Sequence, residues 1–173
     1  MKKAIITGIT GQDGAYLAKL LLSKNYKVFG AYRRTSSQSF WRIKYLGIQD
    51  NPNLKLIEHD FIDASSTIRM VSEISPDEIY NLAAQSFVTY SFEDAFSTIN
   101  ININGTLFVL SAIKEKAPNC KVYFAASSEM FGKVRETPQN ENTSFHPRSP
   151  YGISKVAGFD LTRNYRESYG LFA

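Results

Sequence analysis

Two residues near the end of the chain have the types and the spacing of a proton-transfer pair. Tyr151 and Lys155 are four positions apart, so a helix would place both side chains on one face. An ammonium group beside a phenol favours the phenolate, which can accept a proton. An isolated Tyr-x-x-x-Lys pair is commonly just a surface contact. The pair therefore indicates chemistry only if the fold places it beside a ligand.

Further polar groups follow the apolar run 121–126. Ser127, Ser128 and Glu129 come directly after it. A serine at the carboxyl end of a strand could hydrogen-bond a hydroxyl or carbonyl group of a substrate. The alternative is that the serines cap the strand and that Glu129 is solvated.

A third candidate feature is the glycine-rich stretch Thr7-Gly8-Ile9-Thr10-Gly11-Gln12-Asp13-Gly14, which follows the apolar residues 4–6. Glycines spaced three apart allow a sharp turn from a strand into a helix, and the missing Cβ atoms let a phosphate approach the backbone. Apolar residues at helical spacing follow the turn. A glycine triplet alone could be an ordinary tight turn, but this context favours a dinucleotide pocket.

These candidates need a scaffold, and strand and helix patterns alternate along the chain. Strands are expected at 4–6, 27–32, 54–57, 78–82 and 121–126. Helices are expected after Gly14, from about Asp63 until Pro76 stops the helix, from about Phe92 to Lys116, and from about Pro150 to Tyr169. This rhythm predicts an α/β fold with a doubly wound parallel sheet in the order 3-2-1-4-5. Ligands bind such sheets beyond the carboxyl ends of the strands.

The segment 99–104 is ambiguous. Its strict alternation of isoleucine and asparagine suggests a strand, but asparagine fits strands poorly. A longer series spaced by three and four favours a helix. We expect its apolar face to consist of Phe96, Ile99, Ile103, Leu107 and Leu110.

Composition limits the remaining function classes. The 173 residues could form one domain, and 43% of them are hydrophobic. The net charge of +4 is spread along the chain, which argues against nucleic-acid binding. No apolar run approaches the ~20 residues of a membrane span, and Met1-Lys2-Lys3 lacks the apolar stretch of a signal peptide, so we expect a cytoplasmic protein. The single cysteine, Cys120, excludes a disulfide framework or metal cluster and is expected to pack in the core.

The end of the chain resembles an interrupted fold. Gly170 has the position of a helix stop, and residues 171–173 would begin another strand. We therefore expect residues 1–173 to be a truncated dinucleotide-binding domain without its C-terminal strands and most of a substrate-binding domain.

The segment 33–42 bears on the choice of cofactor. The second strand ends in Tyr32-Arg33-Arg34, with no acidic residue to bind a free ribose 2′-hydroxyl. Two arginines suit a 2′-phosphate, which favours NADP over NAD. We expect the whole segment 33–42 to be a loop. Its Phe40 and Trp41 either cover the edge of the core or contact another subunit.

Taken together, these motifs resemble those of the extended short-chain dehydrogenase/reductases. Within that superfamily, the glycine turn and three other stretches are similar to those of the GDP-mannose 4,6-dehydratase family. The three stretches are Asn81-Leu82-Ala83-Ala84-Gln85-Ser86, Ser128-Glu129-Met130-Phe131-Gly132 and Pro147-Arg148-Ser149-Pro150-Tyr151-Gly152. Asn102 is also part of the superfamily pattern, and the resemblance covers essentially the whole chain.

The resemblance implies an NADP site and no metal. The cofactor would contact the turn, the two arginines, the end of the third strand, the end of the fourth strand, and the Tyr–Lys pair. These residues are Gly8, Ile9, Thr10, Gly11, Gln12, Asp13, Gly14, Arg33, Arg34, Asp60, Phe61, Leu82, Ala83, Ala84, Gln85, Ser86, Tyr151 and Lys155.

The resemblance also implies a mechanism in which GDP-mannose loses water. Tyr151 would deprotonate the sugar 4-hydroxyl while hydride moves to NADP, and Lys155 would assist. Glu129 would remove the C5 proton and protonate the departing 6-hydroxyl, and Ser127 would hydrogen-bond the C4 oxygen. A homo-oligomer (dimer or tetramer) is expected, and the 173-residue piece alone should be inactive.

Two other functions stay open at this point. A related nucleotide-sugar reductase or epimerase would share most of these residues, and a reductase would consume NADPH. A non-catalytic dinucleotide-binding module could lack Tyr151 or Lys155, but both are present.

Overall fold

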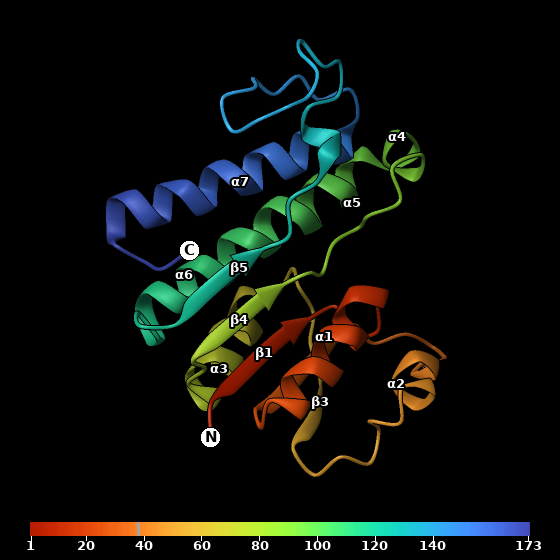
Figure 1. The fold of residues 1–173 in the computed structure, drawn as a ribbon, viewed down its shortest axis with the longest axis vertical. Coiled ribbons are helices and arrows are strands. Elements are labelled where there is room, and N and C mark those ends of the chain that lie inside the picture. The colour runs from red at the N-terminus through yellow and green to blue at the C-terminus, as the bar shows by residue number, and fades with distance from the viewer. Residues whose placement is uncertain (38) are drawn as a thin grey trace.

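A five-stranded parallel sheet forms the centre of the molecule, with helices on both faces (Figure 1). The structure, a computed structural model, describes residues 1–37 and 39–173. The strand order β3-β2-β1-β4-β5 confirms the predicted doubly wound topology. The strands are β1 (Lys3–Thr7), β2 (Lys27–Tyr32), β3 (Leu54–Glu58), β4 (Glu78–Asn81) and β5 (Lys121–Phe124).

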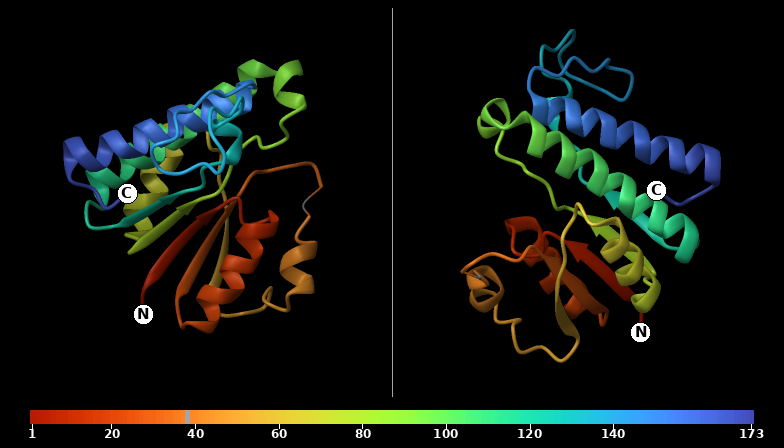
Figure 2. Two further views of the ribbon diagram at one scale, coloured as in Figure 1. Left: turned by 45° about the horizontal axis from the view of Figure 1, so that its top comes forward. Right: turned by 180° about the vertical axis from the view of Figure 1, so that it is seen from behind.

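Helices cover both faces of the sheet (Figure 2), and two separate apolar clusters hold the layers together. One face of the sheet packs against α1 (Gln12–Ser23) and the short α2 (Trp41–Tyr45). The other face packs against α3 (Ala64–Ile74), α6 (Gly105–Lys116) and α7 (Pro150–Tyr169). Because successive residues of a strand point to opposite faces, neighbouring residues of β1 enter different clusters.

The helix predicted from Phe92 to Lys116 is interrupted near its start. The short helix α4 (Tyr90–Glu93) is separate, and a new helix begins after Asp94, whose carboxylate accepts a hydrogen bond from the Ser97 amide at 2.9 Å. The second helix then continues as α5 (Ala95–Ile99), the π-helix η1 (Asn100–Asn104) and α6.

The predicted apolar face of this helix is wrong at its start. Phe96 is 92% exposed, whereas Thr98, Asn102 and Thr106 are buried. Polar side chains thus occupy the inner face of the first turns, and the π-helix, which contains Asn102, shifts the register of the helix between Thr98 and Thr106. A pattern based on hydrophobic residues could not identify that face.

The helix at residues 95–116 also differs from the expectation that the chain has no segment long and apolar enough to span a membrane. This 22-residue helix is long and apolar enough to cross a membrane by length and composition alone. That property is weak support for a membrane span, because core helices also have it. Here, the helix packs against α3 and α7.

Helix α7 has the start and the end that the sequence predicts. Ser149 caps the helix by accepting a hydrogen bond from the Gly152 amide at 3.0 Å, and Gly170 ends it in a left-handed conformation with φ of 69°. The chain then turns back toward β5, where the Val122 amide donates to the Phe172 carbonyl at 2.8 Å. Residues 171–173 do not form the predicted strand beyond this contact.

The segment 33–42 is only partly the predicted loop, because α2 begins at Trp41; Gln38 lies outside the described residues. Phe40 covers the edge of the core, with its ring 5.1 Å from that of Tyr32. Trp41 is 55% exposed, so the suggested subunit contact remains a prediction for this residue.

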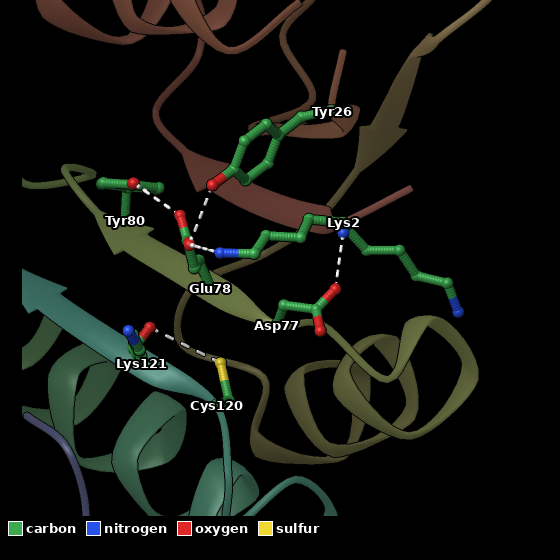
Figure 3. A network of polar contacts seen from close by, with 8 residues as sticks. Lys2, Tyr26, Asp77, Glu78, Tyr80, Cys120 and Lys121 are labelled. Atoms are coloured by element: carbon green, nitrogen blue, oxygen red, sulfur yellow. Dashed lines mark hydrogen bonds and ion pairs between the residues drawn. The ribbon is translucent and has the colours of Figure 1, made fainter. Parts of the chain in front are cut away.

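A polar network joins the amino ends of β1 and β4 (Figure 3). The Glu78 carboxylate accepts hydrogen bonds from Tyr80, Tyr26 and Lys2 at 2.8, 3.0 and 3.4 Å. Burial alone would raise the pKa of Glu78, but these donors hold it below its ordinary value. In addition, the Lys3 amide donates to Asp77 at 2.7 Å. The network fixes the sheet at the end where its strands begin.

Cys120 lies directly before β5 and is buried, as the sequence predicts. Burial raises the pKa of its thiol to about 12, with smaller contributions from Asp77 and Glu78. The thiol therefore stays protonated at neutral pH, which fits a packing role.

The central strand gives the first prediction, which concerns stability. The Ile5 side chain is fully buried in the cluster beneath α3 and α6. Ile5→Ala should lower the free energy of unfolding by roughly 2–5 kcal/mol because it leaves a cavity. Urea denaturation of the 173-residue chain measures the change. The matched control is Leu20→Ala on the exposed side of α1, and an equal loss in both variants would contradict this packing.

Candidate functional site

A cleft of about 600 Å³ lies beyond the carboxyl ends of β1, β2 and β4. This is the place at which ligands bind doubly wound sheets. Its walls come from the glycine turn, from the segments that follow β2, β3 and β4, and from the π-helix. The lining residues are Gly8, Thr10, Gly11, Ala31, Tyr32, Arg33, His59, Asp60, Phe61, Ile62, Leu82, Ala83, Ala84, Gln85, Ser86, Phe87 and Ile101.

The glycine turn closes tightly on itself. Gly8 has φ of 71°, a left-handed conformation that favours glycine. A Cβ atom at Gly14 would lie 2.5 Å from the Gly8 carbonyl oxygen, so this position has no room for a side chain. The first turn of α1 begins directly after Gly11, which provides no side-chain cap. The amides of that turn are therefore available to an anion, as in a phosphate site.

The end of β4 is held against this turn by Thr7. The Thr7 hydroxyl accepts hydrogen bonds from the amides of Leu82 and Ala83 at 3.0 and 3.1 Å. A Cβ atom at Gly8 would lie 3.0 Å from the Ala83 Cα atom, so the two backbones pass very close to each other. The predicted segment Leu82–Ser86 is thereby placed along one wall of the cleft.

The buried side chain of Asn102 connects the cleft to α7. Its Oδ1 atom accepts from the Gln85 amide at 2.8 Å. Its Nδ2 atom donates to the Gln85 carbonyl at 3.1 Å and to the Ser154 hydroxyl at 2.9 Å. Ser154 in turn donates to the Tyr151 carbonyl at 2.7 Å. One amide group thus joins the cleft wall to the helix turn that carries the Tyr–Lys pair.

The wall after β3 contains a buried histidine. His59 Nδ1 lies 3.1 Å from the Ser66 hydroxyl oxygen, and Nε2 lies 3.2 Å from that of Thr67. Burial lowers the pKa of His59, so the ring is neutral near pH 7. The next aromatic residue, Phe61, packs close to Gly105, where a Cβ atom would lie 2.6 Å from its ring. Asp60 and Phe61 therefore line the cleft from a fixed backbone.

The two arginines after β2 occupy different places. Arg33 lines the cleft. The Arg34 side chain is 81% exposed, and its Nε atom lies 4.0 Å from a carboxylate oxygen of Glu58 on β3. Arg33 is therefore the better placed of the two to meet a ligand in the cleft.

Tyr151 and Lys155 are both buried in the first turns of α7. The Lys155 ammonium donates to the Ala125 carbonyl, just beyond β5, at 2.8 Å. It also lies 5.7 Å from the centre of the Tyr151 ring and 5.0 Å from that of Phe124. Burial lowers the pKa of Lys155 to about 8. The pair has the arrangement of a phenol with a cation nearby.

Ser127 lies between β5 and the short 3₁₀ helix η2 (Ser128–Met130), and Glu129 lies within η2. The Ser127 hydroxyl accepts a hydrogen bond from the Glu129 amide at 3.2 Å. The Glu129 backbone contacts the first turn of α7, since a Cβ atom at Gly152 would lie 2.7 Å from the Glu129 carbonyl oxygen. The segment of Glu129 and the turn of Tyr151 are therefore directly packed.

The structure brings most of the predicted cofactor residues to one cleft, but Arg34, Tyr151 and Lys155 are not among its lining residues. Gln12, Asp13 and Gly14 form the first turn of α1, and Ile9 is buried beneath the turn. Sequence patterns did not identify Tyr32, His59 or Ile101 as lining residues. His59 directly precedes the predicted cofactor residue Asp60, and this position is the signal that could have identified it as a lining residue. Within residues 1–37 and 39–173, no group of three or more His, Cys, Asp or Glu could hold a metal ion.

Known proteins similar to this chain include many nucleotide-sugar enzymes. The family model described as GDP-mannose 4,6 dehydratase matches residues 5–173. The chain is 50% identical to the GDP-mannose 4,6-dehydratase of Yersinia enterocolitica, covering all of this chain and 48% of that protein. It is 46% identical to the human GDP-mannose 4,6 dehydratase, covering 98% of this chain and 47% of the human protein. The chain thus spans about half the length of these relatives.

Among solved structures, the Bordetella bronchiseptica enzyme WbmH in complex with NAD⁺ has the same architecture. Its TM-score is 0.80 at 28% sequence identity, and the match covers 99% of this chain and 53% of WbmH.

The buried lysine gives a pH-dependent prediction. In the unfolded chain Lys155 has its ordinary pKa of 10.5, whereas in the folded chain its pKa is about 8. Between these values the unfolded state binds more protons, so folding becomes more favourable as pH rises. Below about pH 8 both states are charged, and the cost of burying the charge is fully present. The stability of the parent relative to Lys155→Met should therefore rise between about pH 8 and pH 10.

Urea unfolding of both proteins across this range measures that difference. Lys19→Met on the exposed surface of α1 is the matched control for loss of one positive charge. A constant stability difference between the parent and Lys155→Met across the range would contradict the burial of the ammonium group.

Proposed function

Because the chain belongs to the GDP-mannose 4,6-dehydratase family, we propose that it is the cofactor-binding part of an enzyme that converts GDP-mannose to GDP-4-keto-6-deoxymannose with loss of water. The observation that carries the proposal is the hydrogen-bonded path from Gln85 through Asn102 to Ser154. This path connects the proposed phosphate-binding cleft to the buried Tyr–Lys pair. A module that only binds a dinucleotide would not need such a pair.

The cleft fits a dinucleotide. Its backbone turn at Gly8 and Gly14 has no room for side chains, and the amides at the start of α1 are open to a diphosphate. The turn and the segment Leu82–Ser86 would hold the pyrophosphate and the nicotinamide ribose, while Asp60 and Phe61 would contact the adenine. When bound, NADP⁺ would supply a hydride acceptor that later returns the hydride to the sugar.

Tyr151 would accept the proton of the sugar 4-hydroxyl as C4 is oxidised. Lys155 would stabilise the phenolate, because its ammonium lies near the Tyr151 ring in a buried environment of low dielectric. Ser127 would donate a hydrogen bond to the oxygen at C4, which accumulates negative charge during enolisation.

Glu129 would determine the type of reaction. The 4-ketone acidifies the proton at C5, and the Glu129 carboxylate would remove it. The resulting carboxylic acid would protonate the departing 6-hydroxyl, so that one water leaves and the carboxylate is regenerated. A reductase or an epimerase can work without this second acid–base group, and the family relatives do not favour those alternatives.

We also propose NADP rather than NAD as the cofactor. Arg33 lines the cleft and can provide a bidentate site for a 2′-phosphate. WbmH was solved with NAD⁺, so the choice needs a direct test on this chain. Further proposals are a homo-oligomer and a cytoplasmic location, without binding of nucleic acid or membranes.

The cofactor prediction can be tested with the 173-residue chain itself. We expect NADP⁺ to bind more tightly than NAD⁺ in isothermal titration calorimetry. Arg33→Met should reduce the preference for NADP⁺ roughly tenfold, because one charged hydrogen-bonding group is lost. Arg34→Met is the matched control and should have the smaller effect, since its side chain is directed toward Glu58. Tighter binding of NAD⁺ by the parent would contradict the assignment of NADP.

The reaction itself requires a longer polypeptide. The 173-residue chain should show no turnover of GDP-mannose, because it spans only about half the length of its relatives. A chimera can supply the missing part by joining residues 1–173 to the region of the Yersinia enterocolitica relative that the chain does not cover. This chimera should form the 4-keto-6-deoxy product from GDP-mannose. A chimera that is folded and binds NADP⁺ but forms no product would contradict the proposed activity.

In the same chimera, Glu129→Gln should lower turnover by roughly a hundredfold or more, because the acid–base group is lost. Binding of NADP⁺ should change little. The reduced cofactor should accumulate after GDP-mannose is added, because C4 oxidation proceeds and water loss does not. Its near-ultraviolet absorbance measures this. Glu141→Gln in an exposed loop is the matched control, and equal turnover in both variants would rule out the role of Glu129.

A further inference from the structure

Arg42 contacts the glycine turn from a distant part of the sequence. Its Nη1 atom donates a hydrogen bond to the Thr10 carbonyl at 3.1 Å. The residue lies in the first turn of α2, and it is not one of the residues that line the cleft. Its guanidinium therefore contacts the turn on the side away from the cleft.

The contact fixes one peptide group of the turn at both ends. The carbonyl of the Thr10–Gly11 peptide is held by Arg42, and its N–H group donates to the Gly8 carbonyl at 2.9 Å. This peptide directly precedes the open amides at the start of α1. Its orientation therefore affects where those amides point.

Arg42 is itself held in place on two sides. Its guanidinium carbon lies 4.4 Å from the centre of the Trp41 ring, which restricts the plane of the group. The adjacent residue Ile43 is fully buried in the cluster under α1, so the backbone of α2 is anchored in the core. The anchored backbone of α2 thus holds the Arg42 guanidinium beside the glycine turn.

We propose that Arg42 is a positioning residue for the dinucleotide pyrophosphate. It orients the Thr10–Gly11 peptide and places a positive charge behind the turn that would receive two negative phosphates. This inference rests on the proposed dinucleotide function. It goes beyond it by assigning to α2 a role in cofactor affinity that is separate from reading the 2′-phosphate.

The two roles of arginine predict different results. The pyrophosphate is common to NADP⁺ and NAD⁺, so loss of Arg42 should weaken both cofactors by a similar factor. Loss of a residue that reads the 2′-phosphate, as proposed for Arg33, should weaken NADP⁺ alone. The ratio of the two dissociation constants therefore separates positioning from phosphate recognition.

The experiment measures both dissociation constants for the 173-residue chain by calorimetry. Arg42→Met should raise each of them roughly tenfold and leave their ratio within about twofold of the parent value. Arg42→Lys keeps the charge and a donor, so it should recover most of the affinity for both cofactors. Arg163→Met removes an exposed arginine of α7 and should change neither constant. Thermal unfolding without cofactor checks that the variants are folded.

Three results would overturn the proposal. Arg42→Met could bind both cofactors like the parent, it could lose NADP⁺ affinity alone, or Arg42→Lys could recover no affinity although it is folded. If Arg42→Met does not fold, the comparison rests on Arg42→Gln, which keeps a neutral donor and should weaken both cofactors equally. A parent chain that binds neither cofactor would instead contradict the proposed function.

Discussion

The buried amide of Asn102 is the contact on which the arrangement of the site depends. It uses its oxygen for the Gln85 amide and its nitrogen for the Gln85 carbonyl and the Ser154 hydroxyl. Three separate segments, namely the end of β4, η1 and α7, therefore meet at one side chain. A buried amide is costly unless its hydrogen bonds are satisfied, so displacement of any one segment leaves polar atoms without partners. Such a group favours a single arrangement of the three segments.

The π-helix and the polar inner face of its helix follow from the same requirement. Thr98 accepts a hydrogen bond from the Gln85 side chain at 3.0 Å, and Thr106 donates to the Asn102 carbonyl at 2.7 Å. Thr98, Asn102 and Thr106 form a polar stripe that faces the end of β4. The apolar part of the helix begins only after this stripe, where α6 packs into the core. The first turns of this helix thus position the site, and its last turns pack in the core. The Glu78 network holds the opposite end of β4.

The predictable part of the molecule consists of its local patterns. The strands, the glycine turn, the start of α3 after Asp63 and both ends of α7 are encoded by short stretches whose chemistry acts on their neighbours. The orientation of η1 was not predictable, because the partners of Asn102 are 17 and 52 positions away in the sequence. The same holds for Arg42, whose contact with Thr10 spans 32 positions. Phe96 belongs to the apolar series at helical spacing and is nevertheless exposed, because hydrophobicity alone cannot distinguish the inner face of a helix from an outer one.

The placement of Glu129 illustrates why the family motif Pro-Tyr-Gly is more than a helix start. Gly152 follows Tyr151, and a side chain there would collide with the Glu129 carbonyl and, at 3.1 Å, with Pro147. In addition, the Ser149 hydroxyl accepts a hydrogen bond from the Gly152 amide. The absent side chain lets the segment of the carboxylate pack directly on the turn of the phenol. The Glu129 backbone in η2 is thereby held against the helix turn that carries Tyr151. Our mechanism uses these two residues in sequence, Tyr151 for oxidation and Glu129 for loss of water.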